Sequence, residues 1–282
     1  MNKVLKTVLK GGLSLTSICL LLTSCANNEP GYYDKVTDDL MGQDLEDVLS
    51  EIIYHEKAIN YANVASYYPK TDSAGVENKI ILFYNGEVCS TKMGDPDYKP
   101  MQAGEADDPN ILNREHVWCQ SRFRIYGSLD GTYGKAANPG PATDLYNVRP
   151  CRGDINVHRS NIIYGENSSA LYDPATIEGG DATYRGEAAR IIFYCATRYQ
   201  KLDILDVENV TTGPKSHEFG KLSDLLRWNL AYAPNDREKL RNDAVQEIQG
   251  NRNPFVDHPE YACRIYGNTN ETTKSICKEY LK

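Results

Sequence analysis

The sequence has no surplus of positive charge and only one long hydrophobic run. Its 282 residues contain 31 Lys and Arg against 39 Asp and Glu, which gives a formal net charge of −8. The mean hydropathy is −0.55, and the single apolar run near the N-terminus excludes a protein with several membrane spans. The acidic balance argues against a protein that binds polyanions over its whole surface.

Other motifs and residue types that are absent or rare narrow the class of protein further. No two cysteines form a C-x-x-C pair, which argues against a structural zinc site. Phenylalanine is rare, with 5 Phe against 20 Tyr, and tyrosine suits grooves and rims because its apolar ring ends in a polar group. Hydrophobic residues still make up 40% of the chain. That is enough to bury a core, so a disordered chain is excluded.

The N-terminus has the pattern of an export signal. Three lysines lie within the first ten residues, a short apolar run covers 13–22, and Leu22-Thr23-Ser24-Cys25 resembles a bacterial lipobox. We therefore predict cleavage before Cys25 and a lipid on Cys25, which anchors the chain to a membrane without spanning it. The alternatives are an uncleaved anchor and an ordinary signal peptide with a chance cysteine.

This interpretation divides the chain into three parts. Residues 1–24 form a lipoprotein signal peptide, 25–43 hold the lipidated cysteine and a flexible tether, and 44–282 form the folded domain. Ala26 permits the outer membrane, facing either the periplasm or the cell surface. Six further cysteines allow up to three disulfides in an exported protein, and their 15 possible pairings stay open. They are Cys89, Cys119, Cys151, Cys195, Cys263 and Cys277.

Hydrophobic periodicity predicts one α+β domain with long loops. Helices are expected over 44–59, 187–199, 221–231 and 236–249. A strand is expected over 79–84, followed by an Asn-Gly turn and a return strand from 87. Asn235 is the expected N-cap of the last helix, with Glu238 placed for a capping box and Gly250 just past its end. Gly- and Pro-rich stretches over 91–110 and 126–143 indicate loops.

The stretch 113–165 combines basic charge with an acid–histidine pair. It has seven Lys or Arg and four Asp or Glu, although the whole chain is acidic, and this local balance suits a phosphate substrate. A carboxylate such as Glu115 and an amide such as Asn161 are hard ligands for Mg²⁺ or Ca²⁺. His116 can take a proton from a water. If the segment is extended, Glu115 and His116 point to opposite faces, and together these groups suit metal-assisted phosphodiester hydrolysis.

Four motifs follow one another along the chain. They are NREHVW at 113–118, DLYN at 144–147, GDINVHRSN at 153–161 and IQGNRNPF at 248–255. Their types and order resemble the bacterial endonuclease I family, secreted or periplasmic nucleases of the ββα-metal (His-Me finger) class. The resemblance covers more than half of the chain after signal cleavage. It implies an α+β fold in one domain, with a ββα-metal core and additional helices.

The resemblance also implies roles for single residues. His116 matches the general base, and Glu115 and Asn161 match the metal-binding carboxylate and amide. The implied cofactor is Mg²⁺, with Mn²⁺ or Ca²⁺ as substitutes, and the products would have 5′-phosphate ends. The substrate would be DNA, with RNA left open, cleaved with little sequence preference by an enzyme that we expect to be a monomer.

An arginine stabilises the charged phosphorane in this family, but its segment is variable. Arg122, Arg149 and Arg159 are equal candidates. Asn147 and Asn156 are expected to brace the site rather than bind metal.

The chain departs from the family pattern at three positions. Cys119 replaces the usual proline after the EHVW block, and Cys151 stands where cysteine is not usual. We predict a Cys119–Cys151 disulfide that joins the two segments of the site, against the alternative of separate buried thiols or other pairings. Tyr146 replaces a histidine. For Trp118 and Tyr146, stacking on the bases of an opened strand and packing in the core are the two alternatives.

Two other functions stay open at this point. One is a non-catalytic surface lipoprotein that binds extracellular DNA or glycans, which the tyrosine excess and acidic surface would suit. The other is a metal-dependent phosphoesterase on small nucleotides. The set Glu115, His116 and Asn161 favours a nuclease over a binding module, which has no need of a histidine base beside hard metal ligands.

Overall fold

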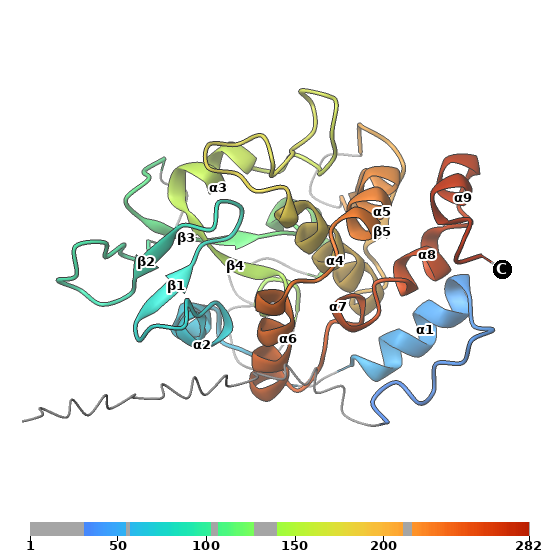
Figure 1. Cartoon of the computed structure of the whole chain (residues 1–282), viewed down its shortest axis with the longest axis horizontal. Coiled ribbons are helices and arrows are strands. Elements are labelled where there is room, and N and C mark those ends of the chain that lie inside the picture. Colours follow the sequence, from blue (N-terminus) through green and yellow to red (C-terminus); the bar gives the residue numbers. More distant parts are fainter. Residues whose placement is uncertain (1–30, 55–56, 103–106, 127–139, 211–215, 282) are drawn as a thin grey trace, which may run out of the picture.

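Two antiparallel strands and a short helix carry most of the first and third motifs, and the second motif, 144–147, lies directly before the second strand. In the computed structural model, β3 (Leu112–His116) pairs with β4 (Val148–Arg152), with Asn113 opposite Cys151 and Glu115 opposite Arg149. Helix α3 (Gly153–Arg159) follows β4 directly and lies beside β3 (Figure 1). The expected ββα arrangement and the α+β class are therefore confirmed.

The structure describes residues 31–54, 57–102, 107–126, 140–210 and 216–281. The predicted signal peptide, Cys25 and most of the loop predicted over 126–143 lie outside the described residues. No helix in the described ranges is long and apolar enough to cross a membrane.

A second hairpin packs beside the ββα unit. Strands β1 (Lys79–Ile81) and β2 (Val88–Ser90) pair antiparallel, as the Asn-Gly signal predicts, although the strand expected over 79–84 ends at Ile81. Gly86 has a φ of 66°, a left-handed conformation that glycine adopts without strain. The backbone amide of Phe83 donates to the carbonyl of Pro150 at 2.8 Å, which ties this hairpin to β4. A small parallel pair, β5 (Asp203–Ile204) with β6 (Glu218–Phe219), completes the sheets of the described chain.

The predicted late helices form the core behind these strands. Helix α4 (Thr183–Arg198) is buried along almost its whole length, and α5 (Leu222–Ala231) packs against it. Helix α6 (Asp236–Gln249) begins after Asn235, whose side chain accepts from the amide of Glu238, and ends at Gly250 with φ 95°. The carboxylate of Glu238 does not complete the predicted capping box, because it pairs with Arg190 at 2.5 Å instead.

Short helices cover the edges of this core. They are α2 (Tyr68–Thr71), α7 (Pro254–Asp257), α8 (Tyr261–Tyr266), α9 (Glu271–Cys277), and the 3₁₀ turns η1 (Tyr61–Tyr67), η2 (Gln120–Arg122) and η3 (Arg124–Tyr126). The turns η1 and η2 matter for function, because both supply side chains to the pocket described below.

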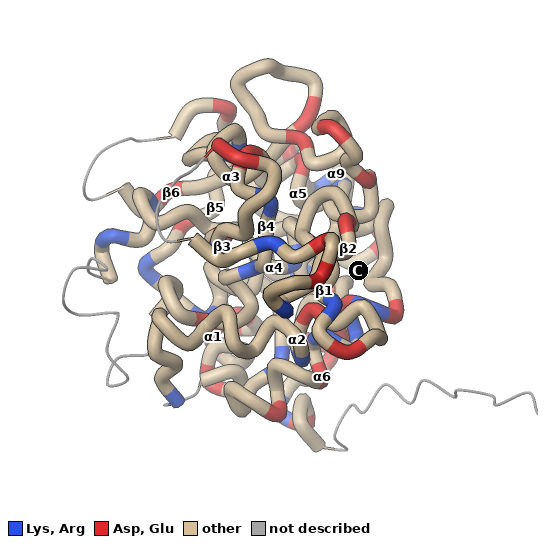
Figure 2. The backbone as a smooth tube through the Cα atoms, turned by 90° about the vertical axis from the view of Figure 1, so that its left-hand side faces the viewer, with Lys and Arg blue, Asp and Glu red and all other residues tan. Residues whose placement is uncertain are grey.

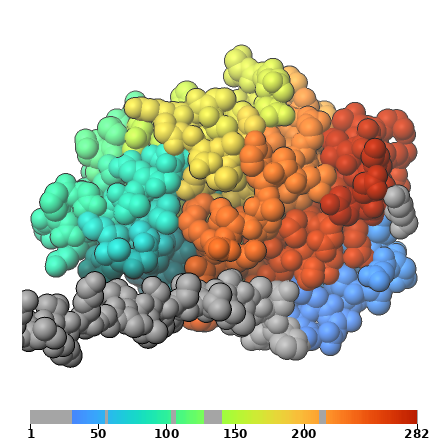
Figure 3. Space-filling view, in the orientation of Figure 1, coloured from blue at the N-terminus to red at the C-terminus, as the bar shows by residue number. Residues whose placement is uncertain are grey.

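The N-terminal expectations need two corrections. The helix predicted over 44–59 is α1 (Gly42–Ile52), which is shorter at its end. Residues 31–43, predicted as part of a flexible tether, dock on the C-terminal helices: Tyr33 donates to Asp257 at 2.7 Å, and Arg264 donates to the carbonyl of Leu40 at 2.8 Å. Figure 3 shows this blue segment and α1 beside the red C-terminal part. Tyrosine side chains make the contact favourable, since they bury a ring and keep a hydrogen bond.

The predicted Cys119–Cys151 disulfide is wrong. Both thiols are free and buried, and the disulfide among the described residues joins Cys263 in α8 to Cys277 in α9. Cys151 lies opposite Asn113 in the β3–β4 ladder, whereas Cys119 lies beyond the other end of β3. A disulfide needs Cβ atoms about 4 Å apart, and this register holds the two residues too far from each other.

Candidate active site

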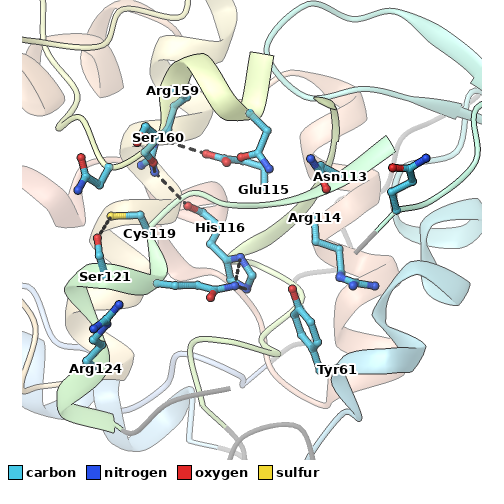
Figure 4. A pocket seen from close by; sticks show the side chains of 14 residues that line it. Tyr61, Asn113, Arg114, Glu115, His116, Cys119, Ser121, Arg124, Arg159 and Ser160 are labelled. Atoms are coloured by element: carbon cyan, nitrogen blue, oxygen red, sulfur yellow. Dashed lines mark hydrogen bonds and ion pairs between the residues drawn. The ribbon is translucent and has the colours of Figure 1, made fainter. Parts of the chain in front are cut away.

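A pocket of about 480 Å³ opens over β3 and the end of α3. Its walls are residues 113–116 of β3, the segment 119–121 that leads into η2, Asn156 and residues 159–161 around the end of α3, and Tyr61 at the start of η1 (Figure 4). Two of the motifs, at 113–118 and 153–161, therefore meet at one cavity together with the distant Tyr61.

The alternation of β3 separates Glu115 from His116, as expected for an extended segment. Glu115 points toward α3, and His116 points to the opposite side, toward Tyr61 (Figure 4). The Oε1 atom of Glu115 lies 3.3 Å from Nε of Arg159 and accepts from the Tyr84 hydroxyl at 2.6 Å. Burial raises the pKa of Glu115, while Arg159 and Tyr84 oppose the rise.

The imidazole of His116 is buried and held by two partners. Its Nε2 lies 3.0 Å from the carbonyl oxygen of Ala142, and its Nδ1 lies 3.1 Å from Nε2 of Gln120. A carbonyl only accepts, so Nε2 carries the proton, and the lone pair of Nδ1 accepts from the Gln120 amide. Burial lowers the pKa of His116 to about 4, and the nearby charges of Arg114 and Arg159 contribute to this lowering. The ring is therefore neutral at pH 7, with Nδ1 able to accept a proton.

Asn161 reaches the pocket through a sharp turn at the end of α3. Ser160 has a φ of 50°, and Asn161 follows it as an exposed residue. Arg122 fixes the backbone of Asn161, because the Asn161 carbonyl accepts from Nε and Nη2 of Arg122, both at 3.3 Å. The side-chain amide makes no hydrogen bond with another described residue, and Asn161 lines the pocket.

The donor set of this pocket fits a hard divalent cation. Both contacts of Glu115 use Oε1, and Oε2 makes no hydrogen bond within the described chain. Asn161 and Asn156, whose amide oxygens are also hard ligands, line the same cavity. Carboxylate and amide oxygens suit Mg²⁺, which uses few protein ligands and keeps water or phosphate oxygens around it. No cluster of three His, Cys, Asp or Glu occurs among the described residues, so a zinc-type site has no support there.

The structure separates the three candidate arginines. Arg159 lines the pocket; it pairs with Glu115 and donates to the carbonyls of His116, at 3.3 Å, and of Val117. Arg122 lies behind the pocket wall, where it holds Asn161. Arg149 lies outside the pocket and is 1% exposed between Asp72 and Glu187, at 3.0 and 2.5 Å. The prediction that Arg149 could stabilise the charged phosphorane is wrong, because these two carboxylates occupy its guanidinium.

Asn147 braces the site. Its Oδ1 accepts from the amide of Trp118 at 2.6 Å, and its Nδ2 donates to the carbonyls of Trp118 and Pro141 at 3.1 and 2.8 Å. These bonds hold the end of β3 against the segment that carries Ala142, the partner of His116. Asn156, predicted to act alongside it, instead lines the pocket itself.

Two aromatic residues considered for base stacking lie in the core. Trp118 is fully buried and donates to the carbonyl of Arg122 at 3.2 Å. Tyr146, which replaces a family histidine, is 2% exposed and donates to Oδ1 of Asn242 at 2.6 Å. Neither lines the pocket, so neither meets a substrate there.

Sequence reasoning gave no role to several side chains of the pocket, and four of them are charged, aromatic or bonded to His116. They are Tyr61, Arg114, Gln120 and Arg124. Period-two alternation could have found Arg114, because it shares a face of β3 with His116. Nothing in the sequence links Tyr61 to the motifs, since it lies more than fifty residues before them.

Comparison with known proteins decides the family. The sequence model described as Endonuclease I matches residues 41–260, well over half of the chain. The chain belongs to the Endonuclease I family. Membership of this nuclease family supports an endonuclease with a nucleic acid substrate.

Relatives in this family carry two kinds of name. The extracellular ribonuclease of Bacillus amyloliquefaciens is 32% identical over 258 residues, which cover 87% of this chain and 81% of that protein. The extracellular ribonuclease of Bacillus subtilis (strain 168) is 32% identical over 237 residues, covering 80% and 75%. Endonuclease-1 of Buchnera aphidicola subsp. Baizongia pistaciae is 28% identical over 127 residues, covering 40% and 46%.

Proposed function

We propose that this chain is an exported, Mg²⁺-dependent endonuclease that hydrolyses phosphodiester bonds of DNA and RNA with little sequence preference. The observation that supports it most is the placement of His116 and Glu115 on opposite faces of one strand, with both lining a pocket that also receives Asn161. Relatives named ribonuclease and endonuclease are the reason to include both nucleic acids.

His116 acts as the general base through Nδ1. The attacking water takes the position of the Gln120 amide beside Nδ1 and gives its proton to that atom. The resulting imidazolium keeps its Nε2 hydrogen bond to the carbonyl of Ala142, which stabilises the positive charge. The low pKa of the free ring keeps the base unprotonated before the reaction.

Glu115 and Asn161 would hold the metal, with Asn156 lining the same cavity. When bound, Mg²⁺ supplies positive charge to the scissile phosphate and the 3′ leaving oxygen. Arg159 orients the Glu115 carboxylate through its contact at 3.3 Å and adds charge at the same wall of the pocket. The water oxygen bonds to phosphorus as the bond to the 3′ oxygen breaks, and the 3′ oxygen takes a proton from solvent, which leaves 5′-phosphate and 3′-hydroxyl ends.

Single arginines in the pocket, rather than a basic lobe, provide the positive charge that a phosphate substrate meets in this acidic protein. Acidic and basic positions are interspersed along the chain, and no separate basic lobe is visible among the described residues (Figure 2). Arg114 and Arg124 line the pocket without an ion pair to any described carboxylate. Contacts of this kind bind backbone phosphates and do not directly distinguish one base sequence from another.

A metal titration tests this proposal. The chain from Ala26 onward, with its disulfide intact, is incubated with supercoiled plasmid and with single-stranded RNA over a range of Mg²⁺ concentrations. We expect cleavage that EDTA abolishes, and Glu115→Gln and Asn161→Ala should each need more Mg²⁺ for half-maximal rate. Cleavage in EDTA, or variants with unaltered Mg²⁺ curves, would refute the metal assignment.

The proposed place of action is the outer membrane, through a lipid on Cys25. The lipobox-like pattern supports the lipid anchor, and the relatives named extracellular support export alone. Mass spectrometry of the full-length protein expressed in a bacterium should find diacylglycerol on an N-terminal Cys25. A free N-terminus at another residue would contradict it.

A further inference from the structure

Arg114, like Arg124, lines the pocket without a carboxylate partner among the described residues. Most buried arginines pair with carboxylates, as Arg190 does with Glu238 and Arg252 with Asp257. The guanidinium of Arg114 lies in the pocket and makes no ion pair or side-chain hydrogen bond within the described residues, and its Nε is a buried donor without a partner. An unpaired buried donor costs free energy, so the group is poised to gain from an anionic ligand.

The ring of Tyr61 holds Arg114 in place. The guanidinium carbon lies 4.3 Å from the ring centroid, and the same ring stacks on His116 at 5.9 Å with an interplanar angle of 19°. Figure 4 shows Tyr61 beneath both side chains, on the side of β3 away from Glu115. A cation fixed over an aromatic face loses less rotamer freedom on binding than a free arginine.

The position of Arg114 relative to His116 defines what it can bind. The two residues are separated by two positions on one face of β3, which is about 6.6 Å along the strand. That spacing is comparable with the separation of neighbouring phosphates in a nucleic acid strand. When His116 faces the scissile phosphate, Arg114 therefore faces the next phosphate along the backbone.

We propose that Arg114, held over Tyr61, is the binding site for the phosphate adjacent to the scissile one. The inference rests on the proposed nuclease function and adds a specific substrate-binding residue to it. Arg114 does not touch the reacting atoms, so its loss weakens substrate binding and leaves the chemical step largely intact.

Salt-dependent binding tests this directly. A fluorescently labelled 12-nucleotide single strand, as DNA and as RNA, is titrated with the protein in EDTA at several salt concentrations. Removing one phosphate-binding charge reduces the slope of log K against log salt by about 0.7 for single strands. We expect Arg114→Gln to show this reduction and a roughly tenfold weaker affinity, and Arg114→Lys to restore the slope.

A matched control is Arg227→Gln. Arg227 is 41% exposed on α5 and pairs with Asp224 and Glu166, so its replacement should leave the slope unchanged. In Mg²⁺, Arg114→Gln should raise KM about tenfold with kcat within about twofold. Tyr61→Leu should weaken binding a few-fold, while Tyr61→Phe, which keeps the ring, should bind like wild type.

The possible outcomes separate the two proposals. An Arg114→Gln protein with the wild-type salt slope, whether or not it is less stable, would overturn the inference and leave the nuclease proposal standing. So would an effect confined to kcat. A wild-type protein that neither binds nor cleaves either strand would refute the nuclease function itself.

Discussion

Arg149 provides a sharp test of how the structure divides catalytic from structural arginines. Sequence motifs make it a candidate for stabilising the transition state, but the structure places it between Asp72 and Glu187 and over the ring of Phe83 at 4.3 Å. We expect Arg149→Met to destabilise the fold and to leave the chemistry almost unchanged.

The magnitude follows from what the substitution leaves behind. Removing one partner of a buried ion pair typically costs about 3–5 kcal/mol. Asp72 keeps Arg241 at 3.1 Å and Glu187 keeps Arg237 at 2.7 Å, so neither carboxylate is left alone. We therefore expect the lower end, a loss of about 3 kcal/mol in the free energy of unfolding.

Urea unfolding followed by tryptophan fluorescence measures this loss, and kcat/KM is measured without urea, where the protein stays folded. A matched control is Arg190→Met, because Arg190 is equally buried and pairs with Glu238 at 2.5 Å. Both variants should lose stability and keep kcat/KM within about threefold. An Arg149→Met enzyme with wild-type stability and a rate at least about 100-fold lower would refute the reasoning.

Three further outcomes follow from buried contacts. Burial raises the pKa of Glu187, but Arg149 and Arg237 outweigh burial and bring the pKa to about 2. The ionised carboxylate should therefore contribute about 3 kcal/mol to stability above pH 4.5, and this contribution should be lost toward pH 2. Urea unfolding of Glu187→Gln should show a weaker acid dependence than that of the wild type. Reduction of Cys263–Cys277, which are separated by 14 residues in the sequence, should lower the free energy of unfolding by about 3 kcal/mol; an unchanged urea midpoint in dithiothreitol would contradict this. Asn147→Ala should cost about 2–3 kcal/mol and also slow cleavage, because it releases the segment that orients His116; a stable variant with full activity would show that the brace is dispensable.

The sequence was informative where local pattern decides structure. The extended β3 segment, the Asn-Gly hairpin and the Asn235 and Gly250 helix boundaries depend on neighbours along the chain, and the structure confirms them. The opposite orientations of Glu115 and His116 follow from strand geometry alone.

The wrong predictions concern residues whose roles depend on contacts far apart in the sequence. Arg149 and Glu238 were given local roles, but distant carboxylates and arginines engage both side chains. The Cys119–Cys151 pairing failed because strand register, which sequence does not show, sets those residues apart. Tyr61 reaches the pocket through tertiary packing, so no motif could have identified it.

One measurement tests the central assignment most directly, the cleavage rate of His116→Ala beside that of a control histidine. His217 lies outside the pocket and is 37% exposed beside Asp203, so His217→Ala should cleave plasmid and RNA like wild type. His116→Ala should bind both but cleave them about 10²–10⁴-fold more slowly, with an unchanged circular dichroism spectrum. Equal rates for the two variants would contradict the account.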